Sequence, residues 1–433
     1  MIGAYQQVFA VGGGGIGNEV LSARSLGQGA VGVAAQGEDL AAIYSNPAGL
    51  TNIKGVKASF GATWESIYGS YQSNAGNQTN TRLNDVAVPN AAIGGSSKDG
   101  KMGFGLALES PYGLETHWGK DSPLKYLATD SKLHMLFIDP AVAYRINPMF
   151  SIGAGADYVN VFNADLEKQL NVNNVNASLG APTTTAPDGT SSLIGTGTNW
   201  GYHAGVLIEP NERHALGITY HSKIKLTVTG AANLTGLSGA TAALFGGSSY
   251  STSAYTDIFL PQNIQFGYAF KPTNKWTFEA DAAWYDWYSS RDLNIRYNET
   301  NATRLAILTN SGAGNPTPYN WRDAWSFATG ANYKYSDRLQ LRGGFWYVPY
   351  AAPESTFSPA YNDLNRYGMA IGAGYDVTSN VTVDIAETVI FFGSRVINNN
   401  TGFTSTGDPT ANPGGTFSDF ANLLTANVTY KFR

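Results

Sequence analysis

Residues 424–432, near the C-terminus, read LTANVTYKF and carry the pattern that decides the fold. Every second residue of this stretch is apolar, namely Leu424, Ala426, Val428, Tyr430 and Phe432. Successive side chains of a β-strand point to opposite faces, so the alternation predicts a strand with one apolar and one polar face. The same period recurs in 216–228, 276–282 and 338–347.

Segments of this kind number about fourteen along the chain, and most are 12 to 20 residues long. Strands of soluble sheets usually have about five or six residues, whereas a strand that crosses a membrane needs about 9 to 11. The predicted strands are 56–72, 85–97, 101–117, 131–147, 149–167, 197–210, 212–229, 255–270, 274–295, 318–335, 338–350, 363–378, 380–396 and 416–432.

The connections between these strands alternate between short and long. Short turns rich in Asn, Asp, Pro, Gly and Ser fall at 98–100, 147–148, 210–212, 272–273, 336–337 and near 379, while 168–196 and 230–254 are long and polar. Bacterial outer-membrane barrels have an even number of strands, short periplasmic turns and long external loops. The sequence therefore predicts an all-β membrane protein, a fourteen-stranded antiparallel transmembrane β-barrel over residues 53–433.

The composition agrees with a barrel. The chain has 50 Gly, 25 Tyr, 20 Phe and 9 Trp, but only 14% charged residues, against about 25% in soluble domains. The mean hydropathy is −0.18, and no run of about 18 apolar residues is present, so closed barrels remain as the spanning structure. A soluble sandwich or solenoid would also alternate. Aromatic residues at a strand end, Trp284, Tyr285, Trp287 and Tyr288, favour the membrane interpretation as part of an aromatic girdle.

Charge and cysteine content narrow the partners and the compartment. The net charge of −5 and the absence of a Lys and Arg cluster argue against nucleic acid as a partner. The chain has no Cys, which is compatible with an oxidising periplasm. Residues 1–5 (MIGAY) have neither the basic nor the apolar region of a signal peptide, so we interpret the start as that of a mature or truncated chain.

The first 52 residues differ from the rest, because they are Gly-rich and show no clean alternation. A segment that precedes a closed barrel and is too irregular for a strand is expected in the lumen or the periplasm, and we predict a lumenal plug over 1–52. Two G-x-G-x-x-G patterns, 12–17 and 27–32, could mark a dinucleotide site, but the strand, helix and acidic residue that such a site requires are missing. Glycines for close backbone packing explain them.

No catalytic, metal or cofactor site is predicted. The chain has no G-x-S-x-G element, and its five His residues, His117, His134, His203, His214 and His221, show no H-E-x-x-H spacing. Strand parity places a set of charged residues on the lumenal face: Asp157, Lys223, Lys225, Glu279, Asp281, Arg338, Arg342, Asp384 and Lys431. Such charges can simply pair and hold the wall, although one Lys or Arg beside an apolar pocket would capture a carboxylate.

Two stretches near the N-terminus, SARSLGQGA at 22–30 and AIYSNPAGL at 42–50, and several short motifs after them are similar to segments of a known family. They resemble the FadL family of long-chain fatty acid transporters and their aromatic-hydrocarbon relatives. The resemblance begins with SARSLGQGA at 22–30 and AIYSNPAGL at 42–50, whose Asn-Pro-Ala element is a plug hallmark of the family. It continues with GFGL at 103–106, SPYGL at 110–114, PAVAYRIN at 140–147, GITYHSK at 217–223 and GAGY at 372–375. The order and spacing of these motifs extend it from about Ser22 to the C-terminus.

The resemblance implies a monomeric fourteen-stranded barrel with a plug of about fifty residues and a third strand that kinks inward and opens the wall. The kink is then expected at Ser110, Pro111, Tyr112, Gly113 and Leu114, where a Pro and a Gly also argue for broken pairing. Asn46, Pro47 and Ala48 are expected to form plug or gate structure, and Lys168 matches a basic position that contacts the ligand carboxylate in fatty-acid members.

The function implied is passive uptake of long-chain fatty acids or other small hydrophobic compounds through the outer membrane of a Gram-negative bacterium, with lateral release into lipid. Uptake of monoaromatic hydrocarbons is the alternative, and a barrel lipase, an adhesin or a general porin are alternatives of other classes. The expected surroundings are outer-membrane lipid and lipopolysaccharide. Two features depart from the family: the start through Val20, and Arg433 after the aromatic Phe432.

Overall fold

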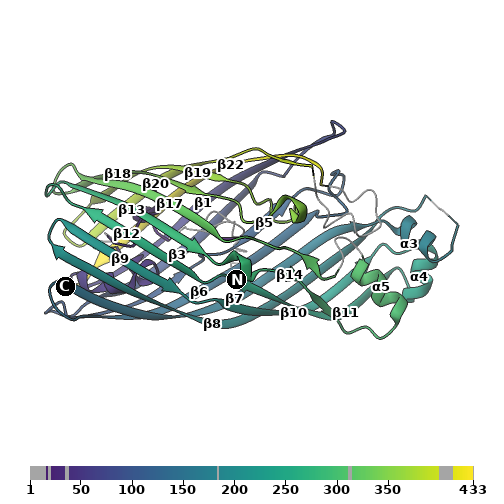
Figure 1. Cartoon of the computed structure of the whole chain (residues 1–433), viewed down its shortest axis with the longest axis horizontal. Coiled ribbons are helices and arrows are strands. Elements are labelled where there is room, and N and C mark those ends of the chain that lie inside the picture. The colour runs from purple at the N-terminus through teal and green to yellow at the C-terminus, as the bar shows by residue number, and fades with distance from the viewer. Residues whose placement is uncertain are drawn as a thin grey trace.

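The computed structural model describes residues 16–17, 21–34, 39–182, 185–310, 315–398 and 413–432. They form a closed antiparallel barrel of fourteen strands around an N-terminal plug (Figure 1). Each antiparallel strand pairs with its neighbours, and β1 closes the barrel on β22. In chain order the wall consists of β1 (Val56–Ser73), β3 (Asn84–Ser96), β4 with β5 (Met102–Glu109 and Leu114–His117), β6 (Asp130–Arg145), β7 (Phe150–Leu170), β8 (Gly189–Asn211), β9 with β10 (His214–His221 and Ile224–Thr235), β11 with β12 (Ser249–Leu260 and Asn263–Phe270), β13 (Trp276–Tyr285), β17 (Ala324–Lys334), β18 (Leu339–Val348), β19 (Arg366–Asp376), β20 (Val381–Phe392) and β22 (Gly415–Lys431).

Short strands complete the sheet. They are β2 (Gln78–Asn80) on β1, β15 (Ile295–Tyr297) on β11, β21 (Arg395–Ile397) on β22, and the separate pair β14 (Asp292–Leu293) and β16 (Thr317–Pro318). Two further 3₁₀ turns are η2 (Trp287–Ser289) and η3 (Glu354–Thr356). The predicted short turns all lie at one end of the barrel, where Lys57 of the first strand faces Lys431 of the last.

At the other end of the barrel the strands extend beyond the length that a membrane requires. β7 has 21 residues and β8 has 23, so about half of each extends beyond a span of about 9 to 11 residues. The predicted long loops 168–196 and 230–254 are therefore partly strand. Helices α3 (Val172–Ser178), α4 (Gly239–Phe245) and α5 (Ala302–Asn310) lie at this end, and Val172, Phe245 and Leu308 form one apolar cluster there.

The outer face of the wall is apolar. Large hydrophobic side chains at alternate positions are exposed, among them Phe60 and Trp64 on β1, Phe266 and Tyr268 on β12, and Ile371 on β19. Polar residues such as Thr63 and Glu65 on the same first strand are buried in the interior. This is the reverse of a soluble protein and is typical of a barrel in lipid. No helix in the described part of the chain is long and apolar enough to cross a membrane.

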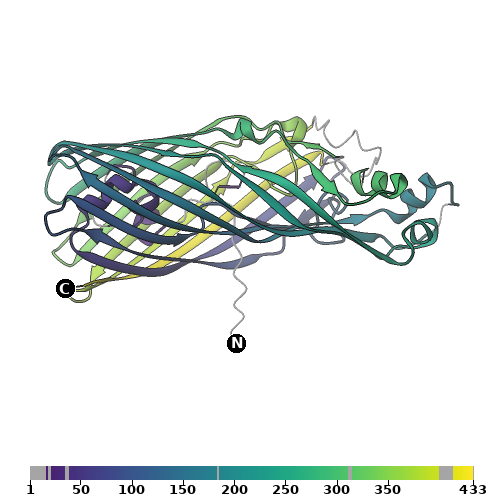
Figure 2. The same cartoon turned by 90° about the horizontal axis from the view of Figure 1, so that it is seen from below.

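The described part of the predicted plug lies inside the barrel (Figure 2). It contains α1 (Ala23–Gly27), α2 (Ala42–Ser45) and the 3₁₀ helix η1 (Pro47–Asn52). Carboxylates of β13 hold its backbone: Asp281 accepts N–H groups of Gly32 and Val33, and Glu279 accepts that of Ala34 at 2.6 Å. Residues 1–15, 18–20 and 35–38 of the predicted plug lie outside the described residues, and the boundary at 52 remains a prediction.

Two groups of predicted side-chain directions are wrong. Lys223 and Lys225 are exposed on the outer face, because the strand is interrupted at 222–223 and its alternation inverts there. Arg338 lies in an exposed turn. Tyr285 and Trp287 are buried, Trp287 completely. Of the four predicted girdle aromatics, Trp284 is partly exposed and Tyr288 is exposed.

Candidate ligand-binding site

The third strand of the barrel is interrupted, and the wall loses pairing beyond the interruption. β4 pairs with β3 on one side and with β6 on the other. After residues 110–113 the strand resumes as β5, which pairs with β6, while 84–90 of β3 pair with β1. Pro111 has no N–H to donate to a ladder, and Gly113 has no side chain to pack on a pleated sheet. Among the described residues no ladder joins 84–90 of β3 to β5.

Hydrogen bonds of the wall close the interruption on its two sides, and the N-terminal segment covers it from inside the barrel. On its outer side the N–H of Arg82 donates to the carbonyl of His117 at 3.0 Å, and on the other side β3 and β4 are in full register. Inside, Gly113 N–H donates to the carbonyl of Ile16 at 3.0 Å, and Tyr112 forms a β-bridge with Gly17. The N-terminal segment therefore lies directly behind the opening in the wall.

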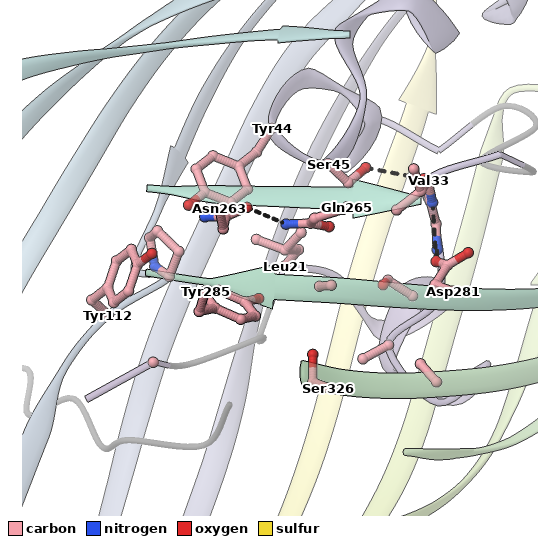
Figure 3. A pocket seen from close by; sticks show the side chains of 17 residues that line it. Leu21, Val33, Tyr44, Ser45, Tyr112, Asn263, Gln265, Asp281, Tyr285 and Ser326 are labelled. Carbon is pink, nitrogen blue, oxygen red and sulfur yellow. Dashed lines mark hydrogen bonds between the residues drawn. The ribbon is translucent and has the colours of Figure 1, made fainter. Parts of the chain in front are cut away.

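An inner cavity of about 740 Å³ adjoins the interruption (Figure 3). Pro111 and Tyr112 line it from the third strand, and Leu21, Tyr44 and Ser45 line it from the plug. The opposite wall is polar and belongs to β12, β13 and β17, with Asn263, Gln265, Asp281, Tyr285 and Ser326. The Gln265 side-chain amide donates to Asn263 at 3.0 Å, so part of this polar wall is already paired.

A middle cavity of about 710 Å³ lies on the loop side of the inner one. Its exposed surface is almost entirely apolar, although Lys132, Asp257 and Asp292 also border it. The cavity brings together side chains far apart in the sequence: Ile16, Leu114, Leu133, Ala164, Val228, Ile258, Phe259, Trp287, Tyr319, Trp321 and Tyr361. The polar ends of Tyr319 and Tyr361 bond to each other, which removes two unsatisfied hydroxyls from this apolar space. The apolar and aromatic lining is that of a pocket for a small hydrophobic ligand.

An outer cavity, also of about 710 Å³, shares Leu166, Leu293, Tyr319 and Tyr361 with the middle one, so the two are neighbours. It contains Lys168 of β7, which faces the lumen opposite Ser191 of β8. Within the described part of the chain Lys168 has no ion-pair partner. An unpaired ammonium in a mostly apolar cavity is a candidate site for a carboxylate.

On β7, Lys168 lies on the loop side of the exposed apolar residues. The last exposed apolar residue of β7 is Phe162, and the outward positions that follow it are the charged Asp165 and Glu167. Burial lowers the pKa of the Lys168 ammonium to about 8. The side chain is therefore still mainly cationic at neutral pH.

An ion cluster stands at the outer edge of the interrupted strand. Glu115 bonds to His117 at 2.5 Å and to His134 at 2.9 Å, and His117 also contacts Asp130 at 3.0 Å. Burial alone would lower the pKa of His117, but its bonds to Asp130 and Glu115 outweigh burial and raise the pKa to about 9. Burial alone would raise the pKa of Glu115, but its bonds to the two histidines lower the pKa to about 2.

Asn46, Pro47 and Ala48 line none of these three cavities. Asn46 instead caps η1, accepting the N–H of Ala48, and its amide donates to the carbonyls of Val33 and Val206. Gly153 and Gly205 of the wall lack the Cβ atoms that would collide with Pro47 and Asn46. The motif thus lies against β7 and β8, and its role as a gate remains a prediction.

The sequence model of the outer membrane protein transport proteins (OMPP1/FadL/TodX) matches residues 6–432. The chain belongs to this family. It is 23% identical over 389 residues to the long-chain fatty acid transport protein of Escherichia coli, covering 84% of each chain, and 27% identical over 431 residues to the 47 kDa outer membrane protein of Pasteurella multocida, covering 95% of this chain and 92% of that one.

Solved structures of the family share the fold. A Pseudomonas aeruginosa FadL homologue superposes with a TM-score of 0.80 at 20% identity, covering 97% of this chain and all of that one. The toluene transporter TodX of P. putida gives a TM-score of 0.72 at 18% identity, covering 96% and 99%. The family is one of outer-membrane transport proteins, and the predicted membership and barrel are confirmed.

Of the predicted site residues, the structure places Pro111, Tyr112 and Leu114 in the cavity linings and Lys168 at their outer end. Sequence reasoning missed the plug residues Tyr44 and Ser45 and the aromatic residues of the middle cavity. Trp287 was visible in the sequence as part of an aromatic cluster. A membrane girdle and a lumenal pocket both contain aromatic residues, so the cluster alone does not distinguish the two. Only the position of Trp287 inside the barrel does.

Proposed function

We propose that the protein takes up small hydrophobic compounds by passive diffusion across the outer membrane of a Gram-negative bacterium. The proposal rests mainly on one observation: three cavities lie in the lumen between Lys168 at the loop end and the interrupted third strand, and the outer two share lining residues. A ligand would enter beside α5, cross the apolar middle cavity and reach the inner cavity at Pro111 and Tyr112. In this orientation the short turns face the periplasm.

We favour long-chain fatty acids as the ligand. An amphipathic molecule with one carboxylate suits a cavity row that begins at an unpaired Lys168 and continues as apolar and aromatic surface. The relatives described as long-chain fatty acid transport proteins agree with this choice. Monoaromatic hydrocarbons are the second candidate, favoured by the aromatic lining of the middle cavity, which needs no charge to bind them.

Release is proposed to be lateral, through the wall at 110–113. The plug is held by carboxylate bonds to its backbone, so its displacement would break several charge-assisted hydrogen bonds at once. A fatty acid gains about 0.8 kcal/mol for each CH₂ that it buries in lipid, so lipid is a more favourable destination than water. Ser110, Pro111, Tyr112, Gly113 and Leu114 would then form the exit, and Asn46, Pro47 and Ala48 would fix the plug beside it.

The remaining parts of the proposal concern partners. The apolar outer belt would contact membrane lipid and lipopolysaccharide, the barrel would work as a monomer, and transport would need neither cofactor nor catalysis. An ester substrate turned over by the purified protein would instead favour a barrel lipase.

The test is uptake of labelled oleate and labelled toluene by Gram-negative cells that lack their own fatty-acid transporter and express this chain behind a signal peptide. We expect oleate uptake above that of cells carrying an empty vector. Uptake of toluene alone would select the hydrocarbon alternative. If folded, surface-exposed protein supported neither, the transport proposal would fail.

A further inference from the structure

A row of buried polar side chains crosses the inner wall at the level of helix α2. It consists of Glu109 on β4, Asp139 on β6, Asp157 on β7, His203 on β8 and His221 on β9, one from each of five consecutive strands. His203 and His221 stand directly opposite in the β8–β9 ladder. None of the five lines the three cavities described above, so transport of the ligand leaves this row unexplained.

Three of these residues are close enough to bind one metal ion together. One potential metal-ligating atom from each of Asp157, His203 and His221 lies within 4.8 Å of the other two. The imidazole rings of His203 and His221 stack with their centroids 5.3 Å apart. His221 is only 3% exposed, so water does not reach it freely. Even so, both of its ring nitrogens lack a hydrogen-bond partner among the described residues. A buried polar group without a partner calls for an explanation.

The two polar contacts of His203 also indicate a missing cation or proton. Its Nε2 lies 2.8 Å from the carbonyl oxygen of Ile43, which can only accept, so this nitrogen carries the proton. In the neutral ring Nδ1 is then an acceptor, and it faces Asp157 Oδ1 at 2.5 Å. Two acceptors that converge need a proton or a cation between them. Metal-ligating histidines commonly donate their other N–H to a carbonyl or a carboxylate, as His203 does here.

Two further carboxyl groups lie beside Asp157. The carboxyl groups of Glu109, Asp139 and Asp157 lie close enough to interact with one another. Within the described part of the chain no Lys or Arg forms an ion pair with any of them. Buried charges are normally paired or coordinate metals.

We propose that Asp157, His203 and His221 bind one divalent transition-metal ion of the Zn²⁺ class. Two imidazoles and one carboxylate form a ligand set that suits Zn²⁺ and not Ca²⁺ or Mg²⁺, which prefer oxygen ligands. With both bonds near 2.0–2.2 Å, the contact between Asp157 Oδ1 and His203 Nδ1 would open to roughly 3 Å. Because His203 also holds Ile43, the ion would fix β7, β8 and β9 to α2 of the plug.

The experiment measures metal binding, so its result does not depend on transport. Purified full-length protein in detergent is stripped with EDTA, dialysed against Zn²⁺ or Co²⁺, and assayed by elemental analysis and by the visible absorption of bound Co²⁺. We expect one ion for each chain in the wild type, and at least a 100-fold weaker Kd in His221→Ala and Asp157→Asn. His214→Ala is the matched control, because His214 lies on the same strand but stacks on Tyr268 and Phe270 at the outer surface.

Three outcomes would overturn the proposal: no bound ion in the wild type, unchanged affinity in His221→Ala, or equal loss in His214→Ala. The first two would leave a shared proton between His203 and Asp157 as the explanation. If the variants fail to fold, X-ray absorption at the zinc edge of the wild type decides, since two imidazole ligands are required and a spectrum without them refutes the site.

Discussion

Two interrupted regions of the barrel wall, at 110–113 and around 222–223, have different consequences. At 110–113 the third strand breaks while its neighbour β3 continues, and the ladder between them is lost. On the other side of the lumen two adjacent strands break together, at 222–223 and 261–262, and both halves remain paired as β9 with β12 and β10 with β11. Ser222 also bonds to Tyr202 of β8 across the break, as donor and as acceptor.

The comparison shows that two adjacent strands that break together can stay paired with each other, whereas the single break leaves 84–90 of β3 without a ladder to β5. The paired interruption has a different effect: it inverts the alternation of side chains. Ile218 of β9 is exposed to lipid, whereas Ile224 and Val228 of β10, at positions of the same parity, are buried inside. Val228 thereby lines the middle cavity. One region supplies the proposed exit, and the other supplies the apolar surface of the pocket.

The largest effect is expected from joining the edges of the single break. A pair of cysteines, Val86→Cys with Gly113→Cys, would stand opposite each other if the β3–β4 register continued. A short reducible thiol-to-thiol linker should abolish nearly all oleate uptake by closing the proposed exit, and reductant should restore it. The chain has no Cys of its own, so the linker has no other target.

The matched control is Ser222→Cys with Gln262→Cys at the paired break, where the wall is already closed. Linking these two positions should leave uptake unchanged. Equal inhibition at both breaks, or undiminished uptake after complete linking at the first, would show that the exit lies elsewhere.

The inverted alternation predicts a sharp difference between two neighbouring residues. Val228→Asp puts a carboxylate into the apolar middle cavity and should weaken binding of both oleate and toluene by about tenfold or more, because a charge there is poorly solvated. Thr229→Asp places the same group on the outer face. Binding to detergent-solubilised protein measures the difference, and similar losses in the two variants would contradict the inversion.

A more selective effect, on oleate alone, is expected at Lys168. Lys168→Met removes a charge-assisted bond of about 1.5–3 kcal/mol and should weaken oleate binding by about ten- to a hundredfold while sparing toluene. Lys120→Met, at an exposed lysine of the same end, serves as the control. Because the Lys168 pKa is about 8, wild-type oleate affinity should decline between pH 7 and pH 9 as the ammonium loses its proton. Equal loss for both ligands, or a pH dependence that survives in Lys168→Met, would refute the assignment.

The smallest effect concerns the outer edge of the single break, where His117 contributes to stability. Its pKa in the folded protein is about 9, above the usual value of 6.5, so its contribution is complete below about pH 6.5 and is lost as the pH rises through about 9. We expect the thermal midpoint of the wild type to fall over this interval by the equivalent of about 1–3 kcal/mol. His117→Gln should remove most of that dependence, and an unchanged pH profile would exclude His117 as its source.

The sequence predicted the barrel well because a two-residue period and turn residues are local signals. Strand number, short turns and the position of the plug all followed from them, as did the family membership from its motifs. Within one strand, the direction of side chains was predictable only up to an interruption of that strand. A shift of one residue sends every later side chain to the opposite face, and nothing in the local pattern at Lys223 and Lys225 marks that shift.

The candidate site was predictable only in part, for a related reason. Pro111 and Gly113 reveal a break by themselves, but Trp287, Trp321 and Tyr361 meet only because the closed wall brings them around one cavity. Likewise Asp157, His203 and His221 have no recognisable spacing in the sequence. The lateral register of three strands brings them together.

The N–H of Ala23 donates to the side-chain oxygen of Asn427, a residue 404 positions later on the strand that closes the barrel. The plug segment is therefore synthesised before β22 but completes its hydrogen bonds after it. The segment that leaves the ribosome early can reach its final bonds only after the last strand is in place. A plug that is bound in place thus indicates a closed barrel. A protease that cuts near Ala23 would cleave molecules that are still assembling and spare those whose barrel is closed.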